Sequence, residues 1–225
     1  MKRKSLFYVL LLSLFFLPIF GKSQNNEDFA IWTGYKLKKS IAPGTSIRFR
    51  QEIRLINNAS QIQKVFNEIG IRHKFNKYFS IGISYRNSQN VQRENAFSSR
   101  HRMDTYLSLS KKWKTISLQY KARYQLNYRD IFTSENGFTP RQFLRHRFLV
   151  ELDLNRRWNP YVSTEIFNVV RDLPNFASVQ NRYRLGVEYD LNKNNSISVF
   201  YMIRTRSIKT PETDYILGLR LHVKI

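Results

Sequence analysis

Apolar and charged residues alternate with a period of two through most of this chain, and this alternation restricts the fold more than any other feature. Residues 45–55, for example, read Thr-Ser-Ile-Arg-Phe-Arg-Gln-Glu-Ile-Arg-Leu. Successive side chains of a β-strand point to opposite faces, so this segment has one apolar and one charged face. Such strands suit the wall of a membrane β-barrel, where one face contacts lipid and the other faces the lumen.

The first 23 residues have the pattern of a secretory signal peptide. Lys2, Arg3 and Lys4 precede an apolar run over 6–20, and small or polar residues follow it. The run is shorter than the roughly 20 residues that a membrane-spanning helix needs, and Pro18 interrupts it. We therefore expect residues 1–23 to direct export. Residues 24–225 contain no linker or low-complexity stretch, so we expect them to form a single β-barrel domain.

The net charge is strongly positive, +22 over 225 residues. In a soluble chain this surplus would first suggest nucleic-acid binding. Here the basic residues recur along predicted strands instead of gathering in one tail or helix, and an exported protein rarely meets nucleic acid. We therefore expect no nucleic-acid partner. The chain contains no Cys, which excludes disulfides and a catalytic thiol.

Eleven segments have the composition and length of strands. They cover residues 30–37, 45–56, 65–75, 79–87, 100–110, 115–128, 143–154, 160–169, 181–191, 196–206 and 214–225. Tight polar turns alternate with longer connections, as expected for short periplasmic turns opposite external loops. The longer connections are 57–64, 88–99, 129–142, 171–180 and 207–213.

The strand number has two possible values, because bacterial single-chain barrels have even strand counts. Either the first segment lies partly outside the wall, which gives ten strands, or one strand has been missed, which gives twelve. The prediction is therefore an all-β, antiparallel transmembrane β-barrel of 10 to 12 strands of the outer-membrane type, with both termini in the periplasm.

The final segment indicates which residues face lipid. Leu219 and Leu221 share one face, and Arg220 and His222 share the other. In a barrel the apolar set must face lipid. An apolar closing strand resembles the C-terminal signal read by the outer-membrane assembly machinery, an expected partner, although Ile225 replaces the usual final Phe. Aromatic residues near segment ends are expected to form the interfacial belt: Trp32, Tyr35, Trp113, Trp158 and Tyr161.

Four sequence patterns resemble those of one family. They are Trp32-x-x-Tyr35, Arg48-x-Arg50-x-Glu52-x-Arg54-Leu55, Asn159-Pro160-Tyr161-x-x-x-Glu165-x-Phe167 and Asn181-Arg182-Tyr183-x-x-Gly186-x-x-Tyr189. The chain resembles the family catalogued as domain of unknown function 2490, small exported proteins thought to be outer-membrane barrels. The resemblance spans nearly all of residues 24–225 and implies the same fold and location. The family carries no established chemistry, so the resemblance leaves the activity open.

Charged residues at lumen-facing positions are the candidate functional residues. They are Arg48, Arg50, Glu52, Arg54, Arg123, Arg145, Arg147, Glu151, Arg182, Arg184, Glu188, Arg204, Arg206 and Arg220. In the first interpretation, these charges pair and fill the lumen, so that the barrel is an envelope scaffold or a partner-binding barrel. In the second, the positive surplus lines a selective channel for anions or acidic oligosaccharides.

An outer-membrane lipid hydrolase is the third interpretation. His101 and His146 have outward parity near the ends of their strands, and Ser98, Ser99 and Asp104 are close to the first in sequence. Asp104 has inward parity and no spacing is diagnostic of a triad, so we assign no catalytic residue and expect a protein that is not an enzyme. No spacing of His and carboxylates fits a metal site, and no glycine-rich motif fits a nucleotide, so we expect no cofactor.

Basic residues near the predicted outer rim are candidate contacts for lipopolysaccharide phosphates. They are Arg93, Arg100, Arg141 and Arg171. Outer-membrane lipid and lipopolysaccharide are therefore expected partners, and anionic small solutes are added by the channel interpretation. The signal and the strand pattern together predict the outer membrane of a Gram-negative bacterium.

Overall fold

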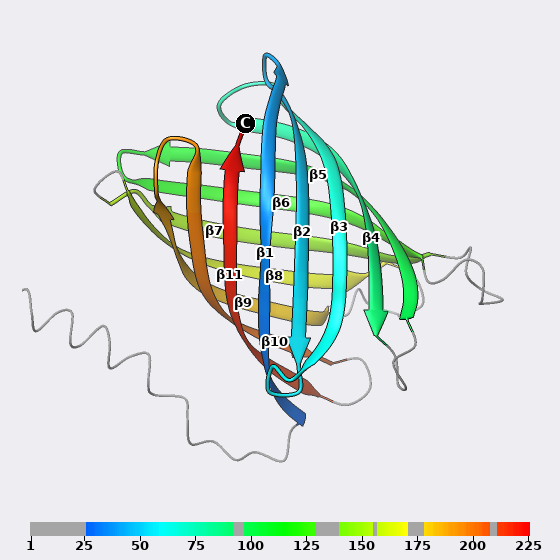
Figure 1. Cartoon of the computed structure of the whole chain (residues 1–225). Coiled ribbons are helices and arrows are strands. Elements are labelled where there is room, and N and C mark those ends of the chain that lie inside the picture. Colours follow the sequence, from blue (N-terminus) through cyan, green and yellow to red (C-terminus); the bar gives the residue numbers. More distant parts are fainter. Residues whose placement is uncertain (1–25, 92–96, 129–139, 155–156, 171–177, 208–210) are drawn as a thin grey trace, which may run out of the picture.

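The chain forms a closed β-barrel (Figure 1). A computed structural model describes residues 26–91, 97–128, 140–154, 157–170, 178–207 and 211–225. Within these ranges eleven strands follow one another around the wall. They are β1 Asn26–Ala42, β2 Thr45–Ile56, β3 Gln61–Lys74, β4 Phe79–Val91, β5 Phe97–Trp113, β6 Ile116–Tyr128, β7 Arg141–Leu152, β8 Trp158–Val169, β9 Ser178–Asp190, β10 Asn195–Arg206 and β11 Glu212–Lys224. The predicted barrel is confirmed, and each predicted strand segment overlaps one of these strands.

The barrel closes in a way that the even-number rule does not allow. Sequential strands pair antiparallel, but β1 and β11 pair in parallel, in register from Asn26 with Glu212 to Lys38 with Lys224. An odd number of strands joined by hairpins runs its first and last strands in the same direction, so only a parallel pair can close it. Eleven strands fall within the predicted range of 10 to 12, but the expected even count and the fully antiparallel pairing are wrong, because β1 pairs with both β2 and β11.

The hairpin connections gather at two ends of the barrel. The tight-turn end carries connections 43–44, 75–78, 114–115, 153–157 and 191–194. The long-connection end carries 57–60, 92–96, 129–140, 170–177 and 207–211. Strand β1 begins at the long-connection end, where Asp28 accepts hydrogen bonds from the backbone N–H groups of Asn57 and Asn58, both at 3.0 Å. Strand β11 finishes at the opposite end. The expectation that both ends of the barrel chain lie in the periplasm is therefore wrong.

The connection between β2 and β3 is shorter than the sequence predicts. The expected loop over 57–64 is a turn over 57–60, because β3 already begins at Gln61. Asn57, Asn58 and Ala59 have φ angles of 54°, 55° and 63°, and Asn is among the residues that tolerate this left-handed region best. The other predicted long connections include residues outside the described ranges.

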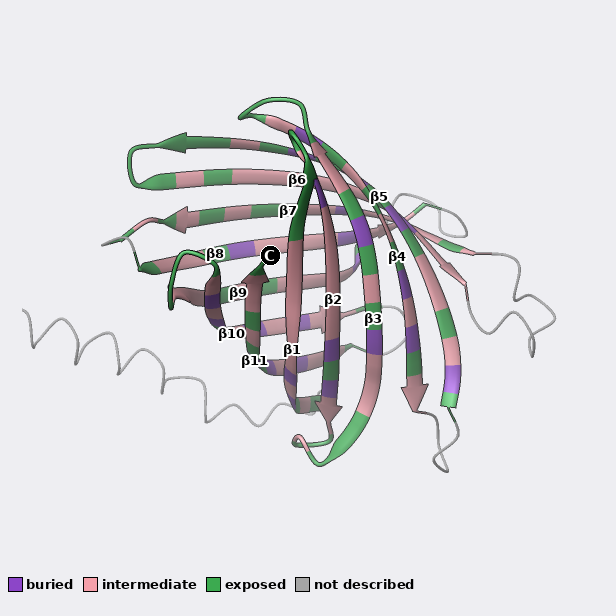
Figure 2. Cartoon of the chain, turned by 45° about the horizontal axis from the view of Figure 1, so that its top comes forward, coloured by how far each residue is buried: buried purple, intermediate pink, exposed green. Residues whose placement is uncertain are grey.

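Alternate side chains face lipid and lumen, and the bands of different exposure along strands such as β10 follow this alternation (Figure 2). On β11, Leu219 is 51% exposed, whereas on β2 the lumen-facing Glu52 is 1% exposed. The outward set is rich in exposed Ile, Leu, Val and Tyr, which form the lipid-facing surface. No helix among the described residues is long and apolar enough to span a membrane.

One part of the inner wall is apolar. Ala30 and Trp32 of β1, Phe200 and Met202 of β10, and Ile216 of β11 form a buried cluster beside the parallel seam. A Cβ atom at Gly218 would overlap the Phe200 ring, so glycine is needed for the ring to lie flat on β11. The same strands also carry charged lumenal residues, such as Arg204 of β10 and Arg220 of β11, so the apolar cluster occupies only part of their inner faces.

The predicted aromatic belt holds only in part. Trp113 and Trp158 are 47% and 52% exposed at strand ends, as an interfacial belt requires. Trp32 is instead buried in the lumen, and Tyr161 lines a lumenal cavity. The belt assignment was wrong for these two residues because their strand parity points inward.

Candidate functional site

Buried carboxylates on the inner wall each hold two or three arginines. Glu52 contacts Arg54 at 2.8 Å and Arg220 at 2.8 Å, and it also pairs with Arg50. The carboxylate is almost fully buried, so these arginines supply the charge compensation that water cannot.

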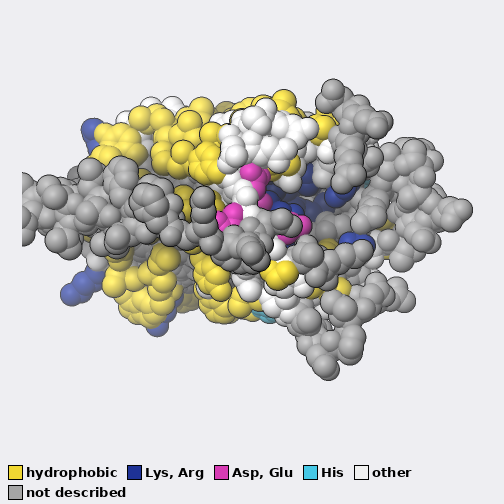
Figure 3. All heavy atoms as spheres, turned by 90° about the horizontal axis from the view of Figure 1, so that it is seen from below, with side chains coloured by type: hydrophobic (Ala, Val, Ile, Leu, Met, Phe, Trp, Pro, Cys, Tyr) yellow, Lys and Arg dark blue, Asp and Glu magenta, His cyan; other side chains and the backbone are white. Residues whose placement is uncertain are grey.

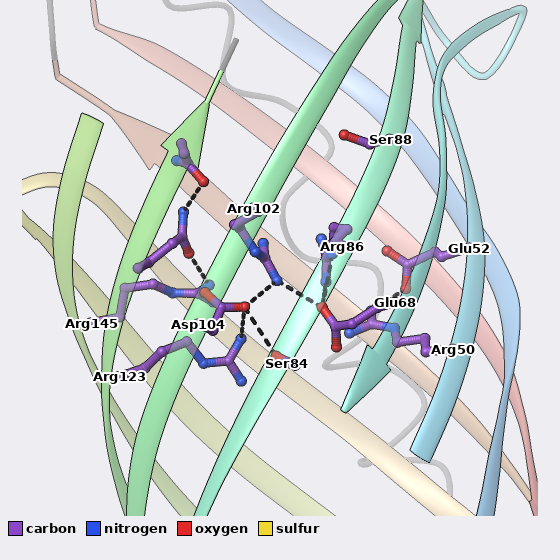
Figure 4. Close-up of polar contacts among 12 residues, drawn as sticks. Arg50, Glu52, Glu68, Ser84, Arg86, Ser88, Arg102, Asp104, Arg123 and Arg145 are labelled. Atoms are coloured by element: carbon purple, nitrogen blue, oxygen red, sulfur yellow. Dashed lines mark hydrogen bonds and ion pairs between the residues drawn. The ribbon is translucent and has the colours of Figure 1, made fainter. Parts of the chain in front are cut away.

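A ladder of ion pairs crosses strands β3 to β6 (Figure 4). Glu68 of β3 contacts Arg86 of β4 at 2.5 Å and Arg102 of β5 at 2.8 Å. The same Arg102 reaches Asp104 at 2.9 Å, and Asp104 contacts Arg123 of β6 at 3.4 Å. Neighbouring strands are thus joined by side chains as well as by backbone hydrogen bonds.

Two further clusters continue the pattern around the barrel. Glu165 of β8 contacts Arg145 of β7 at 2.7 Å and Arg182 of β9 at 3.4 Å. Asp214 of β11 contacts Arg204 at 2.7 Å and Arg206 at 3.1 Å, both from β10. Arg206 also contacts Glu212 at 2.8 Å, so the Asp214 cluster has as many carboxylates as arginines. Arginines outnumber carboxylates in the other clusters, so the inner wall keeps a net positive charge.

Aromatic rings support several of these guanidinium groups. The Arg54 guanidinium lies 3.5 Å from the centroid of Trp32, and that of Arg86 lies 3.6 Å from the centroid of Phe66. Arginine stacks well on aromatic faces, and the stacking fixes the guanidinium plane. The lining is therefore held in place on two sides, by carboxylates and by rings.

Two cavities hollow the lumen. The larger, about 410 Å³, opens toward the long-connection end and reaches Asn90, Asn127 and Gln180. The smaller, about 300 Å³, lies toward the tight-turn end and reaches Glu151 and His222. Figure 3 shows Lys and Arg side chains recessed between flanks covered by hydrophobic side chains. Among the described residues lining the larger cavity, Glu165 is the single acid beside many Arg.

Five arginines line both cavities and therefore lie between them. They are Arg50, Arg123, Arg147, Arg184 and Arg220, from β2, β6, β7, β9 and β11. We call this set the arginine waist. A solute moving from one cavity to the other would pass these guanidinium groups.

The structure places the predicted lumen residues as follows. Arg54, Arg145, Arg182, Arg204 and Arg206 line the larger cavity, and Arg48, Glu151 and Glu188 line the smaller. Glu52 lines neither cavity, but it forms ion pairs with two members of the arginine waist, Arg50 and Arg220. The lumen candidates chosen from the sequence did not include other basic residues that line the cavities: Lys36, Lys64, Arg86, Arg100, Arg102 and Lys121. The inward parity of their strands was the signal that could have found them.

The outer wall carries two Tyr–His pairs. The Tyr85 hydroxyl lies 2.6 Å from His101 Nδ1, and the Tyr120 hydroxyl lies 2.7 Å from His146 Nδ1. Ser99 Oγ is 3.5 Å from His101 Nε2. Asp104 belongs to the lumenal ladder, and no carboxylate among the described residues is hydrogen-bonded to His101 or His146, so the described part of this arrangement does not form a hydrolase triad.

Two of the four predicted rim residues lie within the described part of the chain. Arg141 is exposed at the start of β7, and Arg100 is exposed near the start of β5, where it also lines the larger cavity. Arg93 and Arg171 lie outside the described residues, as does the predicted signal peptide 1–23. Within the described ranges, no group of three or more His, Asp or Glu residues could hold a metal ion.

Comparison with solved structures defines the class of the protein. A structure of the NanC porin matches 77% of this chain and 86% of its own, with 13% identity and a TM-score of 0.50. LpxR from Salmonella typhimurium matches 80% of this chain and 83% of its own, with 8% identity and a TM-score of 0.51. At these identities the likeness shows the fold alone, that of an outer-membrane-type β-barrel.

The family follows from the sequence. The model described as "Protein of unknown function (DUF2490)" matches residues 29–214, and the chain belongs to this family. The resemblance seen in the strand patterns is thereby confirmed. The search of curated proteins gave no match.

Proposed function

We propose that this protein is an outer-membrane barrel whose lumen binds anions and passes small anionic solutes. One observation carries the proposal: the two cavities, one toward each end of the barrel, share the arginine waist as their common lining. Rings and tracks of arginine line pores that pass anions and phosphates, because the positive potential attracts anions and excludes cations.

The alternative, a barrel plugged by its own ion pairs, explains fewer of the lumenal positive charges. Pairing explains the arginines held by buried carboxylates. It leaves Lys36, Lys64, Lys121 and Arg147 of the described lining without a carboxylate in ion-pair distance. Charges in a lumen need either partners or solvent and mobile ions, and the cavities provide room for the latter.

The dimensions favour small solutes. Cavities of about 410 and 300 Å³ are in the range of sites for small molecules. The waist between them is formed by long, charged side chains, so passage there requires contact with guanidinium groups. We therefore expect slow, selective passage of carboxylated or phosphorylated solutes, not a wide aqueous pore.

A vesicle flux assay tests the proposal. The refolded protein is incorporated into lipid vesicles, and the entry of gluconate, of a neutral sugar of similar size and of a large organic cation is compared. A difference in gel mobility between unboiled and boiled samples verifies folding. We expect gluconate to enter fastest. Equal entry of all three, or none from a folded barrel, would reject an anion-selective lumen and favour the plugged scaffold.

Export, outer-membrane location in a Gram-negative bacterium and assembly by the outer-membrane machinery complete the proposal. The support is the barrel fold, the apolar outer surface and the signal pattern of residues 1–23. Arg141, exposed at the long-connection end, is the described residue best placed to meet lipopolysaccharide phosphates.

A further inference from the structure

The members of the arginine waist differ in how they are paired. Arg50 and Arg220 are held by Glu52, and Arg123 is held by Asp104. Arg147 and Arg184 contact no carboxylate within the described part of the chain. Two of the guanidinium groups between the cavities are therefore uncompensated by protein charge.

The nearest candidate partner of Arg147 is already occupied. Glu165 lies opposite Arg147 in the pairing of β7 with β8, but its two oxygens contact Arg145 and Arg182. The Nε atom of Arg147 is buried and has no hydrogen-bond partner. Burying a guanidinium group in this state is costly unless a counter-ion reaches it.

Arg184 of β9, on the other side of β8 from Arg147, also lacks a carboxylate partner among the described residues. Its hydrogen bond goes to the Met202 sulfur at 3.4 Å, a weak acceptor, and its Nε atom is buried without a partner. The Phe200 ring, 4.6 Å away, supports the guanidinium without neutralising it. Ser163 of β8 lies opposite Arg184 in the sheet and faces the larger cavity, so a hydroxyl group lies beside this arginine.

We propose that Arg147 and Arg184 form an oxyanion-binding site for a phosphate group, either free or carried by a small solute. This inference deepens the proposed function and rests on it. Each guanidinium presents planar N–H donors that match phosphate oxygens, and two such groups balance the charge of about −1.5 to −2 that a phosphate monoester carries near pH 7. The cavities on either side leave room for the rest of a phosphorylated solute.

A calorimetric titration tests the site without relying on transport. Orthophosphate and glucose phosphate are titrated separately into the refolded full chain in detergent, in a phosphate-free buffer. Tight binding of both ligands with equal affinity would show that the phosphate group alone is recognised. Tighter binding of glucose phosphate would show that the cavities contact the sugar as well.

Arg72→Gln is the matched control for Arg147→Gln and Arg184→Gln. Arg72 also faces inward, donates from Nε to Ser80 Oγ at 3.1 Å and lines neither cavity. We expect each waist variant to weaken phosphate binding about tenfold or more, equivalent to about 1.4 kcal/mol, and the control to bind as the unmodified chain does. Arg147→Lys and Arg184→Lys retain the charge and serve as second variants if a Gln variant does not fold.

The outcomes separate this inference from the proposed function. Absence of phosphate binding, or equal weakening by Arg72→Gln, would overturn the site even if the vesicle assay shows anion flux. Binding that depends on Arg147 and Arg184 would support the site even if flux is absent, in which case the lumen holds anions without passing them.

Discussion

Replacing Glu52 with Gln should destabilise the barrel more than any other single change of a lumenal carboxylate. Glu52 is 1% exposed and is the one carboxylate of the described lumen that contacts three arginines, Arg50, Arg54 and Arg220. The amide keeps the shape and one acceptor oxygen but removes the negative charge. Three positive charges would then be left close together in a part of the wall with little access to water.

The expected cost is about 3–5 kcal/mol in the free energy of unfolding, the usual penalty for removing one partner of a buried ion pair. The contacts with Arg54 and Arg220 are both 2.8 Å long, short enough for strong charge-assisted hydrogen bonds. Equilibrium unfolding in urea, followed by tryptophan fluorescence in lipid vesicles, measures the change. The double variant Glu52→Gln/Arg220→Gln should recover part of the lost stability. We expect an interaction energy between the two substitutions of about 0.5–3 kcal/mol.

Glu151→Gln is the matched control. Glu151 also faces the lumen and lines the smaller cavity, but no ion pair holds it in the described structure. Its loss should cost less than about 1 kcal/mol, as for a weakly coupled charge in contact with water. If both variants cost the same, or if Glu52→Gln costs under about 1 kcal/mol, the reasoning that carboxylates organise the arginine lining is refuted.

Three further changes test other parts of the structure. Gly218→Ala should lower stability by about 1–3 kcal/mol in the same unfolding assay, because the new methyl group overlaps the Phe200 ring; full stability would contradict that packing. Leu219→Arg should cost about 2–4 kcal/mol near the membrane midplane while Leu219→Val costs little, and equal tolerance would reverse the assigned faces. His146→Ala should leave gluconate flux unchanged, because His146 pairs with Tyr120 and lines neither described cavity; a lipid-hydrolysing activity abolished by His101→Ala or His146→Ala would instead favour an enzyme.

The alternation of residues was sufficient to predict the barrel and its strands. Each apolar or charged position reports a face directly, so Leu219 and Glu52 could be assigned to lipid and lumen without coordinates. The same rule, applied to β1, would have placed Trp32 in the lumen. The belt assignment relied on residue type and position near a segment end, and the parity of the strand decided otherwise.

Neither the parallel closure of the barrel nor the arginine waist could be predicted from the sequence. Whether a barrel closes in parallel depends on pairing between β1 and β11, which are far apart in the chain and carry no local signal of register. Parity places Arg147 and Arg220 in the lumen alike, but only the three-dimensional arrangement shows that Glu52 holds Arg220 and that Arg147 lacks such a partner. Which charges pair across a barrel depends on the shear, that is, on the stagger between neighbouring strands, and the shear cannot be deduced from the sequence.

The reversal potential of the refolded protein in a planar bilayer under a KCl gradient tests the central claim most directly. The account predicts small, steady current steps whose reversal potential lies toward the chloride equilibrium potential, because the waist and both cavities are lined by arginine. Reversal toward the potassium equilibrium potential, or silence from a barrel shown to be folded, would contradict an anion-passing lumen.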